Sequence, residues 1–467
     1  MKELVHRLDL EDIYVLPIGG RWMLFSPRNM TSAIVNRAAV EAIIEYAVDD
    51  KSTVPKTIKD LWHKLSRVPI TTIPSQQGPE KLVIIPTREC NMRCVYCDFG
   101  ASSANATILD PRLACRLVDH VAEKLAATPG AILGIHFFGG EPMIAQPCVE
   151  TIIHYANMVC SRKGLTPWYE ITTNGYFNHN AIPFIGDYVD YVVISIDGDK
   201  PFHDFNRQRG DGSGTYAIIA ENIKRLGRFP VKLSLRACIT NRSVNAMLAI
   251  ASHFCSEFEF DVLCFEMMAE TEFTSTNGLC PPDPNLFAAG ILQAESIAAD
   301  HGVQVINGPS ELYGPRTTSC PVGLGTLMLN PDGILTACYL EVERWTRLGI
   351  DPVVGYVGPV SGPKIEQQKL DAIPGFFKQK PRCVRCFCRY TCAGGCHINQ
   401  TPPGCSLEYN DRCRATRLIT AGRLLRNLKE TATEVSFLEQ PSVMKYLAEN
   451  ADDRLSTWAS DSTQREI

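Results

Sequence analysis

Three cysteines lie close together near residue 90, in the segment Cys90-Asn-Met-Arg-Cys94-Val-Tyr-Cys97. Thiolates at this spacing converge on one centre, but a structural zinc ion needs four protein ligands. The next cysteine, Cys115, lies in a segment that reads as a helix. Three thiolates around one open position are typical of a cubane iron–sulfur cluster, whose free iron can bind a substrate or cofactor. The segment therefore predicts a metal centre with one position left open.

The cysteine segment follows the first of six strand-like stretches. The apolar run at 81–86 reads as a buried strand, and further strands are expected at 132–138, 168–172, 189–195, 231–239 and 261–266. Helix-like stretches lie between them, and Asp110-Pro111 is a typical helix start. Six β/α repeats predict an α/β fold whose parallel sheet curves into a partial (β/α)6 TIM-like barrel over residues 81–310. The active site of such a fold lies at the carboxyl ends of its strands.

Polar and glycine-rich motifs follow three of these strands. The motifs are, in order, Gly139-Gly140-Glu141-Pro142, Thr173-Asn174-Gly175 and Ser195-Ile-Asp197-Gly198. Glycines let a ligand approach the backbone, and a carboxylate such as that of Glu141 accepts hydrogen bonds from a cation. Each motif alone is also typical of an ordinary turn. Their order behind successive strands, after the cysteines, indicates a single site.

This order of motifs resembles the radical S-adenosylmethionine (SAM) superfamily. The resemblance implies that the three cysteines hold a 4Fe–4S cluster and that Gly139, Gly140 and Glu141 receive the SAM amino group. It implies that Arg207 pairs with the SAM carboxylate, in a bidentate way that lysine could not reproduce. The remaining cofactor contacts implied are Tyr96 at the adenine, Asn174, and Ser195 and Asp197 at the ribose or nearby polar atoms. Two alternatives stay open, since Asp197 is also consistent with a turn cap and Arg207 with a surface salt bridge.

A second group of cysteines lies between residues 311 and 430. Its spacing resembles the SPASM domain, which carries two auxiliary 4Fe–4S clusters and would bring the number of clusters to three. By this resemblance, one auxiliary cluster is held by Cys383, Cys386, Cys392 and Cys413, and the other by Cys320, Cys338 and Cys396. Taken alone, the spacing is also consistent with two structural zinc sites.

The fourth ligand of the cluster at Cys320 stays open. Some relatives have a cysteine six residues earlier, where this chain has Gly314, so the ligand is Cys280, Cys388 or Cys405, or the iron is open. Nearby cationic residues are expected to offset the negative charge of the clusters, rather than to attract a peptide or nucleic acid; they are Lys378, Lys380, Arg382, Arg385 and Arg389. The isolated cysteines are expected to pack in the core; they are Cys115, Cys148, Cys160, Cys238, Cys255 and Cys264.

Residues 1–80 are expected to form a small separate α+β unit. Gly19-Gly20 predicts a hairpin, Thr31 or Ser32 is a candidate cap for a following helix, and a second helix is expected over 58–65. This order is similar in shape to the leader-peptide recognition element of peptide-modifying enzymes, which would bind its peptide by adding a strand to the sheet edge. An ordinary N-terminal cap on the main domain is the alternative. At the other end, residues 431–467 are expected to hold a helix and a polar tail that is frayed from Asn450 onward.

The composition of the chain limits the classes of partner that we expect. The net charge of −5 and the pI near 6.1 give no basic footprint for nucleic acid. No run of about 18 apolar residues and no signal-peptide core is present, so a cytoplasmic protein without membrane contact is expected. An external one-electron reductant such as flavodoxin or ferredoxin would be a further partner.

The resemblance implies an oxidoreductase that removes hydrogen from a ribosomally made precursor peptide, with an oxidative side-chain crosslink as the favoured product. One alternative is a formylglycine-forming sulfatase maturase or another protein-modifying SPASM enzyme. Sulfatase maturases carry a glutamine before Gly-Gly-Glu-Pro and an aspartate base after the second SPASM cysteine, where this chain has Phe138 and Tyr339. Tyr339 is therefore a weak candidate for a catalytic base. A non-catalytic metal-cluster scaffold is the alternative of a different class.

Overall fold

The computed structural model describes residues 12–66, 81–97, 99, 107–128, 130–340, 342–377, 380–400, 408–429, 440–450 and 452–460. Its main feature is an 11-stranded sheet in the order β12-β11-β10-β8-β7-β6-β4-β13-β14-β15-β16. All neighbours from β12 to β13 are parallel, and the remaining pairs are antiparallel. Lys378 and Cys405 lie outside the described residues.

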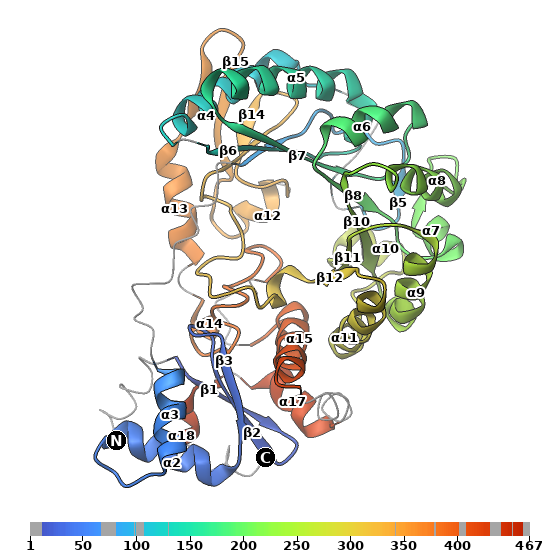
Figure 1. The fold of residues 1–467 in the computed structure, drawn as a ribbon. Coiled ribbons are helices and arrows are strands. Elements are labelled where there is room, and N and C mark those ends of the chain that lie inside the picture. Colours follow the sequence, from blue (N-terminus) through green and yellow to red (C-terminus); the bar gives the residue numbers. More distant parts are fainter. Residues whose placement is uncertain are drawn as a thin grey trace.

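Six parallel strands form the barrel portion and confirm the predicted alternation. They are β4 Lys81–Ile84, β6 Ile132–Phe137, β7 Thr166–Thr173, β8 Tyr191–Ser195, β10 Lys232–Ile239 and β11 Val262–Met267, and β12 Gln304–Ile306 continues the sheet. Alternate side chains of these strands, among them Ile135, Ile171 and Leu235, are fully buried under the helices. The sheet curves without closing, and its helices lie on the outer, convex side (Figure 1).

The outer helices are α4 Pro111–Leu125, α5 Gln146–Lys163, α6 Ile182–Tyr188, α7 Lys200–Asn206, α8 Tyr216–Leu226, α9 Met247–Glu257 and α11 Pro284–Asp300, and α10 Glu272–Thr276 is a short extra turn. The start of α4 is as predicted, because the Asp110 side chain accepts the backbone N–H of Arg112 and Pro111 occupies the first turn. Short 3-10 turns precede several helices, including η2 Pro142–Ala145, η3 His179–Ala181 and η4 Val244–Ala246.

The cysteine-rich C-terminal part continues the same sheet. Strand β13 Thr326–Leu329 pairs in parallel with β4, and β14 Ile334–Thr336, β15 Val353–Gly358 and β16 Gly362–Ile365 follow as an antiparallel meander. The helices of this part are α12 Val342–Thr346, α13 Gln367–Phe377 and α14 Pro381–Val384, after the 3-10 turn η5 Gly308–Ser310. Because β13 is hydrogen-bonded to β4, the loops that carry the C-terminal cysteines begin beside the strand that precedes the first cysteines.

The N-terminal unit has a three-stranded antiparallel sheet and two helices. Its strands are β1 Tyr14–Ile18, β2 Arg21–Ser26 and β3 Thr31–Val35, and its helices are α2 Arg37–Val48 and α3 Lys56–Leu65. The hairpin and the second helix are as predicted, but the prediction that Thr31 or Ser32 caps a helix is wrong. Those residues belong to β3, and Asn36 caps α2 by accepting the N–H of Ala39. β-Branched residues in this stretch favour a third strand over a cap.

The C-terminal helices are α15 Asp411–Asn427, α17 Pro441–Glu449 and α18 Leu455–Ser460. The expectation that the chain frays from Asn450 onward is wrong for Asp453 to Trp458. Leu455 and Trp458 are buried in the core of the N-terminal unit, where Trp458 meets Trp22 edge to face at 5.6 Å. Asp453 accepts the N–H of Val15 on β1 through its backbone oxygen. The two ends of the chain therefore form one packed unit, which Figure 1 shows opposite α5.

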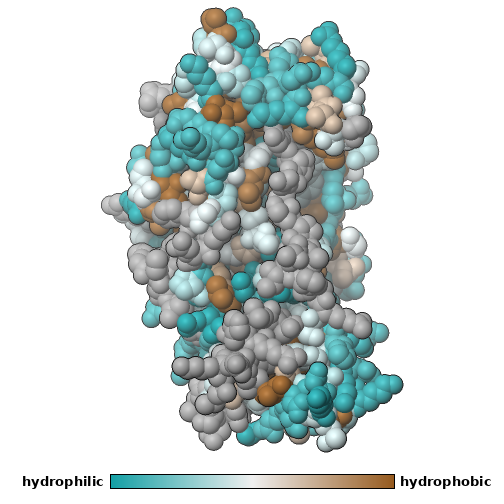
Figure 2. Space-filling model, turned by 90° about the vertical axis from the view of Figure 1, so that its left-hand side faces the viewer, coloured by the Kyte–Doolittle hydropathy of each residue, from teal (hydrophilic) through white to brown (hydrophobic). Residues whose placement is uncertain are grey.

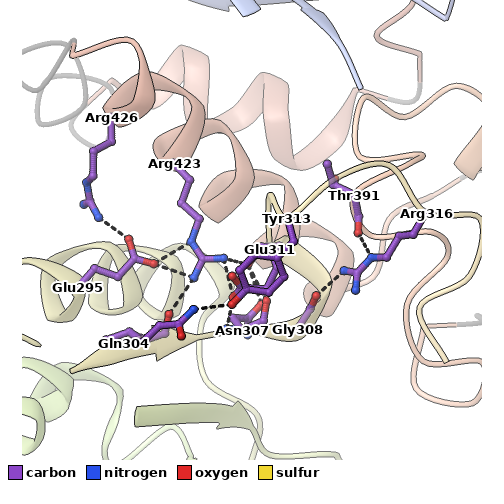
Figure 3. A network of polar contacts seen from close by, with 12 residues as sticks. Glu295, Gln304, Asn307, Gly308, Glu311, Tyr313, Arg316, Thr391, Arg423 and Arg426 are labelled. Atoms are coloured by element: carbon purple, nitrogen blue, oxygen red, sulfur yellow. Dashed lines mark hydrogen bonds and ion pairs between the residues drawn. The ribbon is translucent and has the colours of Figure 1, made fainter. Parts of the chain in front are cut away.

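A buried ionic network joins α15 to the barrel (Figure 3). The guanidinium of Arg423 donates to Glu295 on α11 at 2.7 Å and to Glu311 after η5 at 2.9 Å, and Arg426 also pairs with Glu295. Further on, Arg316 donates to the backbone oxygen of Thr391, in the cysteine-rich loop. These contacts fix α15, which carries Cys413, against the barrel.

No helix among the described residues is long and apolar enough to cross a membrane. On the face shown in Figure 2, hydrophilic residues dominate the coloured surface, and hydrophobic residues occur as small separate groups.

Candidate metal and cofactor site

A cavity of about 290 Å³ lies at the carboxyl ends of the barrel strands. One wall carries the first three cysteines and the motifs that follow β6, β7 and β8. The other wall comes from β10, β11 and the C-terminal part. The residues that line it include Cys90, Cys94, Tyr96, Cys97, Phe138, Gly139, Gly140, Asn174, Ser195, Arg207, Arg236, Cys238, Glu266, Tyr339, Asn399 and Arg412. The predicted motifs therefore meet at one place, as the barrel topology requires.

A short ribbon holds Arg207 beside the cysteines. Strand β5 Arg93–Cys94 pairs antiparallel with β9 Arg207–Gln208, so that Cys94 lies directly opposite Arg207. Asn206 accepts the backbone N–H of Val95 at 3.0 Å and extends the ribbon. Cys94 and Arg207 are more than 100 residues apart in the sequence, and this two-stranded ribbon places the guanidinium at the cysteine site.

The environment of the three thiols fits a thiolate-ligated group. Burial raises the pKa of Cys90 to about 11 and that of Cys94 to about 12, so these thiols ionise readily only when a positive centre compensates the burial. The backbone N–H of Met92 and the side-chain amide of Asn174 both point at the Cys90 sulfur, the latter at 3.6 Å. N–H donors of this kind stabilise metal-bound thiolates.

The two glycines of the second motif lie against the backbone of the cysteine loop. A Cβ on Gly140 would lie 2.1 Å from the backbone oxygen of Glu89, and one on Gly139 would lie 2.5 Å from that of Thr87. The N–H of Gly140 donates to Thr87 at 3.1 Å, and that of Glu141 donates to Glu89 at 2.8 Å. Both glycines also line the cavity. They allow the β6 loop to pack directly against the backbone that leads into Cys90.

The Glu141 carboxylate is fully buried and already has protein donors. It accepts the backbone N–H groups of Met143 and Asn174 at 3.0 and 2.7 Å, and the Thr173 hydroxyl at 2.8 Å. Burial raises the pKa of Glu141 to about 7, although the three donors favour the ionised form. The side chain thus joins the loops after β6 and β7. Gly139 and Gly140 of this motif line the cavity.

The carboxylate of Asp197 connects several elements of the site. Its fully buried carboxylate accepts the Tyr96 hydroxyl at 2.5 Å, the Asn206 amide at 3.0 Å and the backbone N–H of Cys238 at 3.1 Å. It also lies 3.0 Å from Nε of Arg207, whose guanidinium carbon is 5.4 Å from the centre of the Tyr96 ring. Arg207 is therefore buried and not part of a surface salt bridge. Asp197 fixes Tyr96 and Arg207 while both still line the cavity.

Ser195 and Asn174 lie where the sequence places them, and both line the cavity. Asn174 donates to Asn91 at 2.8 Å and accepts the N–H of Tyr176 at 2.7 Å, so its amide orientation is fixed beside Cys90. Ser195 is the last residue of β8, directly beside Arg236 on β10.

The opposite wall holds polar residues that the sequence reasoning missed. Arg236 and Glu266 come from β10 and β11, and Asn399 and Arg412 come from the C-terminal part. Strand periodicity could have found Arg236, because it is a charged residue between Leu235 and Ala237 in the second half of the predicted strand 231–239. No comparable signal marks Asn399 or Arg412, which reach the cavity through tertiary packing.

Comparison with known proteins assigns this architecture. Residues 84–241 match the family model of the radical SAM superfamily. This segment is a radical SAM domain. The chain is 21% identical to the cysteine-type anaerobic sulfatase-maturating enzyme of Clostridium perfringens (strain 13 / Type A), over 72% of this chain and 94% of that protein. The fold is similar to that of anSMEcpe with bound AdoMet (TM-score 0.58, 18% identity, 78% of this chain and 98% of the other). The complex of anSMEcpe with AdoMet and the Cp18Cys peptide gives a TM-score of 0.59 at 18% identity, over 76% and 99%.

The cysteines that follow the radical SAM domain separate into two groups. The first comprises Cys320, Cys338 and Cys396, which lie close enough for their charges to interact. The backbone N–H of Leu340 points at the Cys338 sulfur at 3.5 Å, and that of Asn399 points at the Cys396 sulfur at 3.4 Å. Burial raises the pKa of Cys320 to about 12 and that of Cys338 to about 11. This is the same combination of burial and N–H donors as at Cys90.

The second group surrounds a small cavity of about 20 Å³, lined by Cys383, Cys386, Cys388, Cys392 and Cys413. Arg417 donates to the Cys386 sulfur at 3.4 Å, and the Gln400 amide lies 4.0 Å from the sulfurs of Cys392 and Cys413. Cys388 lies with this group and not with Cys320, which argues against it as the missing ligand of the first group. Cys280 is exposed at the end of β10, beside Asn241.

Two cationic residues near the second cysteine group, Lys380 and Arg389, have different contacts. Lys380 lies near Cys383, Cys392 and Cys413, and burial lowers its pKa while these thiols raise it. Arg389 instead pairs with Asp12 at 2.6 Å and so ties the N-terminal unit to the cysteine loop. Among the isolated cysteines, Cys148, Cys160 and Cys264 are buried as expected, whereas Cys238 lines the cavity. Within the described residues, no group of three or more His, Cys, Asp or Glu side chains is placed to hold a single metal ion.

Proposed function

We propose that Cys90, Cys94 and Cys97 hold a 4Fe–4S cluster and that SAM lies beside it in the cavity. The observation that carries this proposal is the meeting of the cysteine loop, the Arg207 ribbon and Ser195 in one cavity. When bound, the cluster and SAM supply a 5′-deoxyadenosyl radical that removes a hydrogen atom from an unreactive C–H bond. An external one-electron reductant such as flavodoxin or ferredoxin would be the electron source.

The chain's own residues bind and orient SAM in this proposal. Arg207 is held by Asp197 through Nε and has its two terminal nitrogens available for the SAM carboxylate. The backbone at Gly139 and Gly140 receives the amino group, Ser195 contacts the ribose, and Tyr96 lies by the adenine. Asn174 orients Cys90. The side chains of Glu141 and Asp197 act indirectly, since each fixes two of these elements.

Two auxiliary 4Fe–4S clusters are proposed for the later cysteines. Cys383, Cys386, Cys392 and Cys413 would hold one of them. The other would be held by Cys320, Cys338 and Cys396, with Cys280, Cys405 or an open position as the fourth ligand. The N–H donors at Cys338, Cys396 and Cys386 support this assignment. A cluster close to the cavity could accept the electron that an oxidative reaction leaves behind.

The proposed substrate is a ribosomally made precursor peptide that receives an oxidative side-chain crosslink. A relative that modifies proteins and a similar fold solved with a peptide support a peptide substrate. The N-terminal unit is proposed to bind the leader along β3. The edge of β1 is occupied by the bridge from Tyr14 to Arg454, whereas no described strand pairs with the outer edge of β3. A free edge can accept a peptide as an additional strand.

Formylglycine formation is the second candidate, because a sulfatase-maturating enzyme matches 72% of this chain. Tyr339 disfavours it. Burial raises the pKa of Tyr339 to about 12, so this phenol is a poor base at neutral pH compared with the aspartate that the resemblance places there. Phe138 also replaces the glutamine of that group.

Anaerobic reconstitution, followed by iron and sulfide counting and a SAM cleavage assay with dithionite, tests the proposal. Wild type should form 5′-deoxyadenosine, and Cys94→Ala should lose that product while keeping the iron of the later cysteines. A wild type that forms none contradicts the enzyme assignment. With a candidate precursor peptide encoded beside this gene, mass spectrometry separates the reactions. Loss of two hydrogens indicates a crosslink, whereas an aldehyde in place of a cysteine side chain indicates formylglycine.

Proline substitutions at Ser32 and Ala33 test the leader site. Successive N–H groups of a strand point to opposite sides, so one of these two positions bonds to β2 and the other faces the open edge. The inward proline should lower stability. The outward proline should leave stability and uncoupled SAM cleavage unchanged while it weakens peptide binding. Unchanged peptide affinity for both variants would remove the leader proposal.

A further inference from the structure

Arg236 has an unusual place in the cavity. It lies in the middle of β10, directly beside Ser195 on β8 and Cys264 on β11, and its side chain points into the cavity. Its neighbours along the strand, Leu235 and Ala237, face the other way and are fully buried. A charged residue at an inward position of such a strand is costly unless a partner compensates its charge.

The guanidinium of Arg236 has no such partner in the part of the chain that the structure describes. No hydrogen bond or ion pair within 4.0 Å reaches it, whereas Arg207 pairs with Asp197 and Arg412 donates to the backbone oxygen of Met267 at 2.5 Å. Burial lowers the pKa of Arg236, but the Glu266 carboxylate, the Cys264 and Cys238 thiols and the Tyr339 phenol together raise it above its usual value, so the side chain stays charged. Five N–H donors therefore face the cavity with nothing to donate to.

Glu266 is near but does not neutralise this wall. Its carboxylate accepts the Cys264 thiol at 3.6 Å instead. With Arg412 on the same wall, two cations face one carboxylate. Arg207 on the opposite wall is already balanced by Asp197. The excess positive charge of the cavity is thus located at Arg236 and Arg412, away from the cysteine loop.

An aromatic surface adjoins this wall. The Tyr339 ring packs against Phe138 with centroids 5.0 Å apart and ring planes tilted by 55°. Tyr339 is 43% exposed and lines the cavity. Arg236 lies close enough to lower the pKa of Tyr339, against the larger opposite effect of burial. The open space between Arg236 and Tyr339 is therefore bounded by a cation on one side and by an apolar ring on the other.

We propose that Arg236 binds a carboxylate of the peptide substrate, which makes an aspartate or glutamate side chain near the modified residue a specificity determinant. A guanidinium fork matches a carboxylate in a bidentate manner, and in a buried cavity this pairing discriminates strongly against the neutral amide. The subsite rests on the proposed function, since it assumes that SAM occupies the cysteine wall and is served by Arg207. The carboxylate of SAM itself is the other possible source of the same chemistry, and the experiment distinguishes the two.

The test measures equilibrium binding to the full-length, anaerobically reconstituted protein with SAM bound. The probes are two capped pentapeptides, Ac-Gly-Gly-Glu-Gly-Gly-NH2 and the same peptide with glutamine. Wild type is expected to prefer the glutamate peptide by about tenfold, as one charge-assisted hydrogen-bonded pair provides. Arg236→Gln should reduce this ratio to about one, and Arg236→Lys should give an intermediate ratio because it keeps the charge but loses the fork.

The matched control is Arg242→Gln, which removes an exposed arginine just beyond the same strand, where it packs on Phe205. It should keep the wild-type ratio. SAM affinity, measured separately, should be unchanged in Arg236→Gln. A wild type that does not distinguish the peptides, or an Arg236→Gln variant that still does, overturns the proposal. Loss of SAM affinity without any peptide preference assigns Arg236 to SAM and equally overturns it.

If Arg236→Gln does not fold, as judged by circular dichroism, the lysine variant gives the decision. Failure of wild type to cleave SAM would instead contradict the proposed function and leave the peptide preference measurable.

Discussion

The ion pair between Arg417 and Asp453 offers a decisive test of how the chain ends are joined to the cysteine-rich part. Both side chains are buried, at 1% exposure each, and the guanidinium contacts the carboxylate in a bidentate way at 2.5 and 2.9 Å. Asp453 also accepts the N–H of Phe387 at 3.2 Å. The perturbation is Asp453→Ala, which leaves the Arg417 charge buried without its partner.

The expected loss follows from this burial. Removing one partner of a buried pair costs about 3–5 kcal/mol, mostly because the remaining charge is uncompensated. Arg417 retains the Leu447 backbone oxygen at 2.5 Å and the ring of Tyr409 at 4.3 Å, and these contacts favour the lower end of the range. We therefore expect a destabilisation of about 3 kcal/mol. The double variant Asp453→Leu, Arg417→Met should recover part of it, because no buried charge remains.

Urea unfolding of the reconstituted protein, followed by tryptophan fluorescence, measures this effect. Trp458 lies five residues from Asp453 and contacts Trp22, so the signal reports on the unit that the pair holds. Since a chain of several parts need not unfold in one step, the first transition is compared among variants. The control is Glu257→Ala, which breaks the exposed pair with Lys224 at 3.0 Å and should cost less than about 1 kcal/mol. A loss in Asp453→Ala no larger than in that control would refute the reasoning.

Three further perturbations test the cysteine loop, the barrel interior and the second cysteine group. Gly140→Ala should displace the cysteine loop, because its Cβ would lie 2.1 Å from the Glu89 oxygen, and it should therefore lower the amount of iron bound at Cys90. The control Gly134→Ala, whose Cβ would have no atom closer than 3.8 Å, should leave the bound iron unchanged. Burial lowers the pKa of His136 to about 4, so the unfolded chain binds more protons between pH 6.5 and 4 and stability falls as pH falls through that window. From pH 7 to 5.5 wild type should lose about 1.4 kcal/mol more than His136→Gln in urea titrations, and parallel curves would contradict this. Cys388→Ser should keep the iron content of wild type, because four other cysteines line the same cavity, whereas Cys386→Ser should lower it; an equal loss would make Cys388 a ligand.

The strands and their motifs could be predicted because their signals are local. Buried parallel strands are continuous apolar runs, so β4, β6, β8 and β11 stand out in the sequence. The motifs after them must meet because parallel strands bring their carboxyl ends to one edge. That is why Ser195 and Asn174 were found at the cavity from order alone.

The contacts that the motif residues make could not be predicted as well from the sequence. Glycines at a strand end suit a ligand or another backbone equally well, and only the tertiary structure shows that Thr87 and Glu89 pack against them. The polar stretch Asn450–Asp453 resembles a frayed end because its partner, Arg417, lies 36 residues away. Burial of a carboxylate there depends on a contact that no local pattern records.

Three arginines summarise how the chain distributes charge around its cysteines. Arg207 is anchored by Asp197 at the first cysteine loop, and Arg417 is anchored by Asp453 at the second cysteine group. In both cases a buried carboxylate fixes the guanidinium, which then reaches a sulfur or the cavity. Arg236 is half-buried and has no anchoring carboxylate within 4.0 Å among the described residues. Because an arginine whose anchor is missing gains most from an external carboxylate, the contrast with Arg207 and Arg417 identifies Arg236 as the position where substrate selection should be sought.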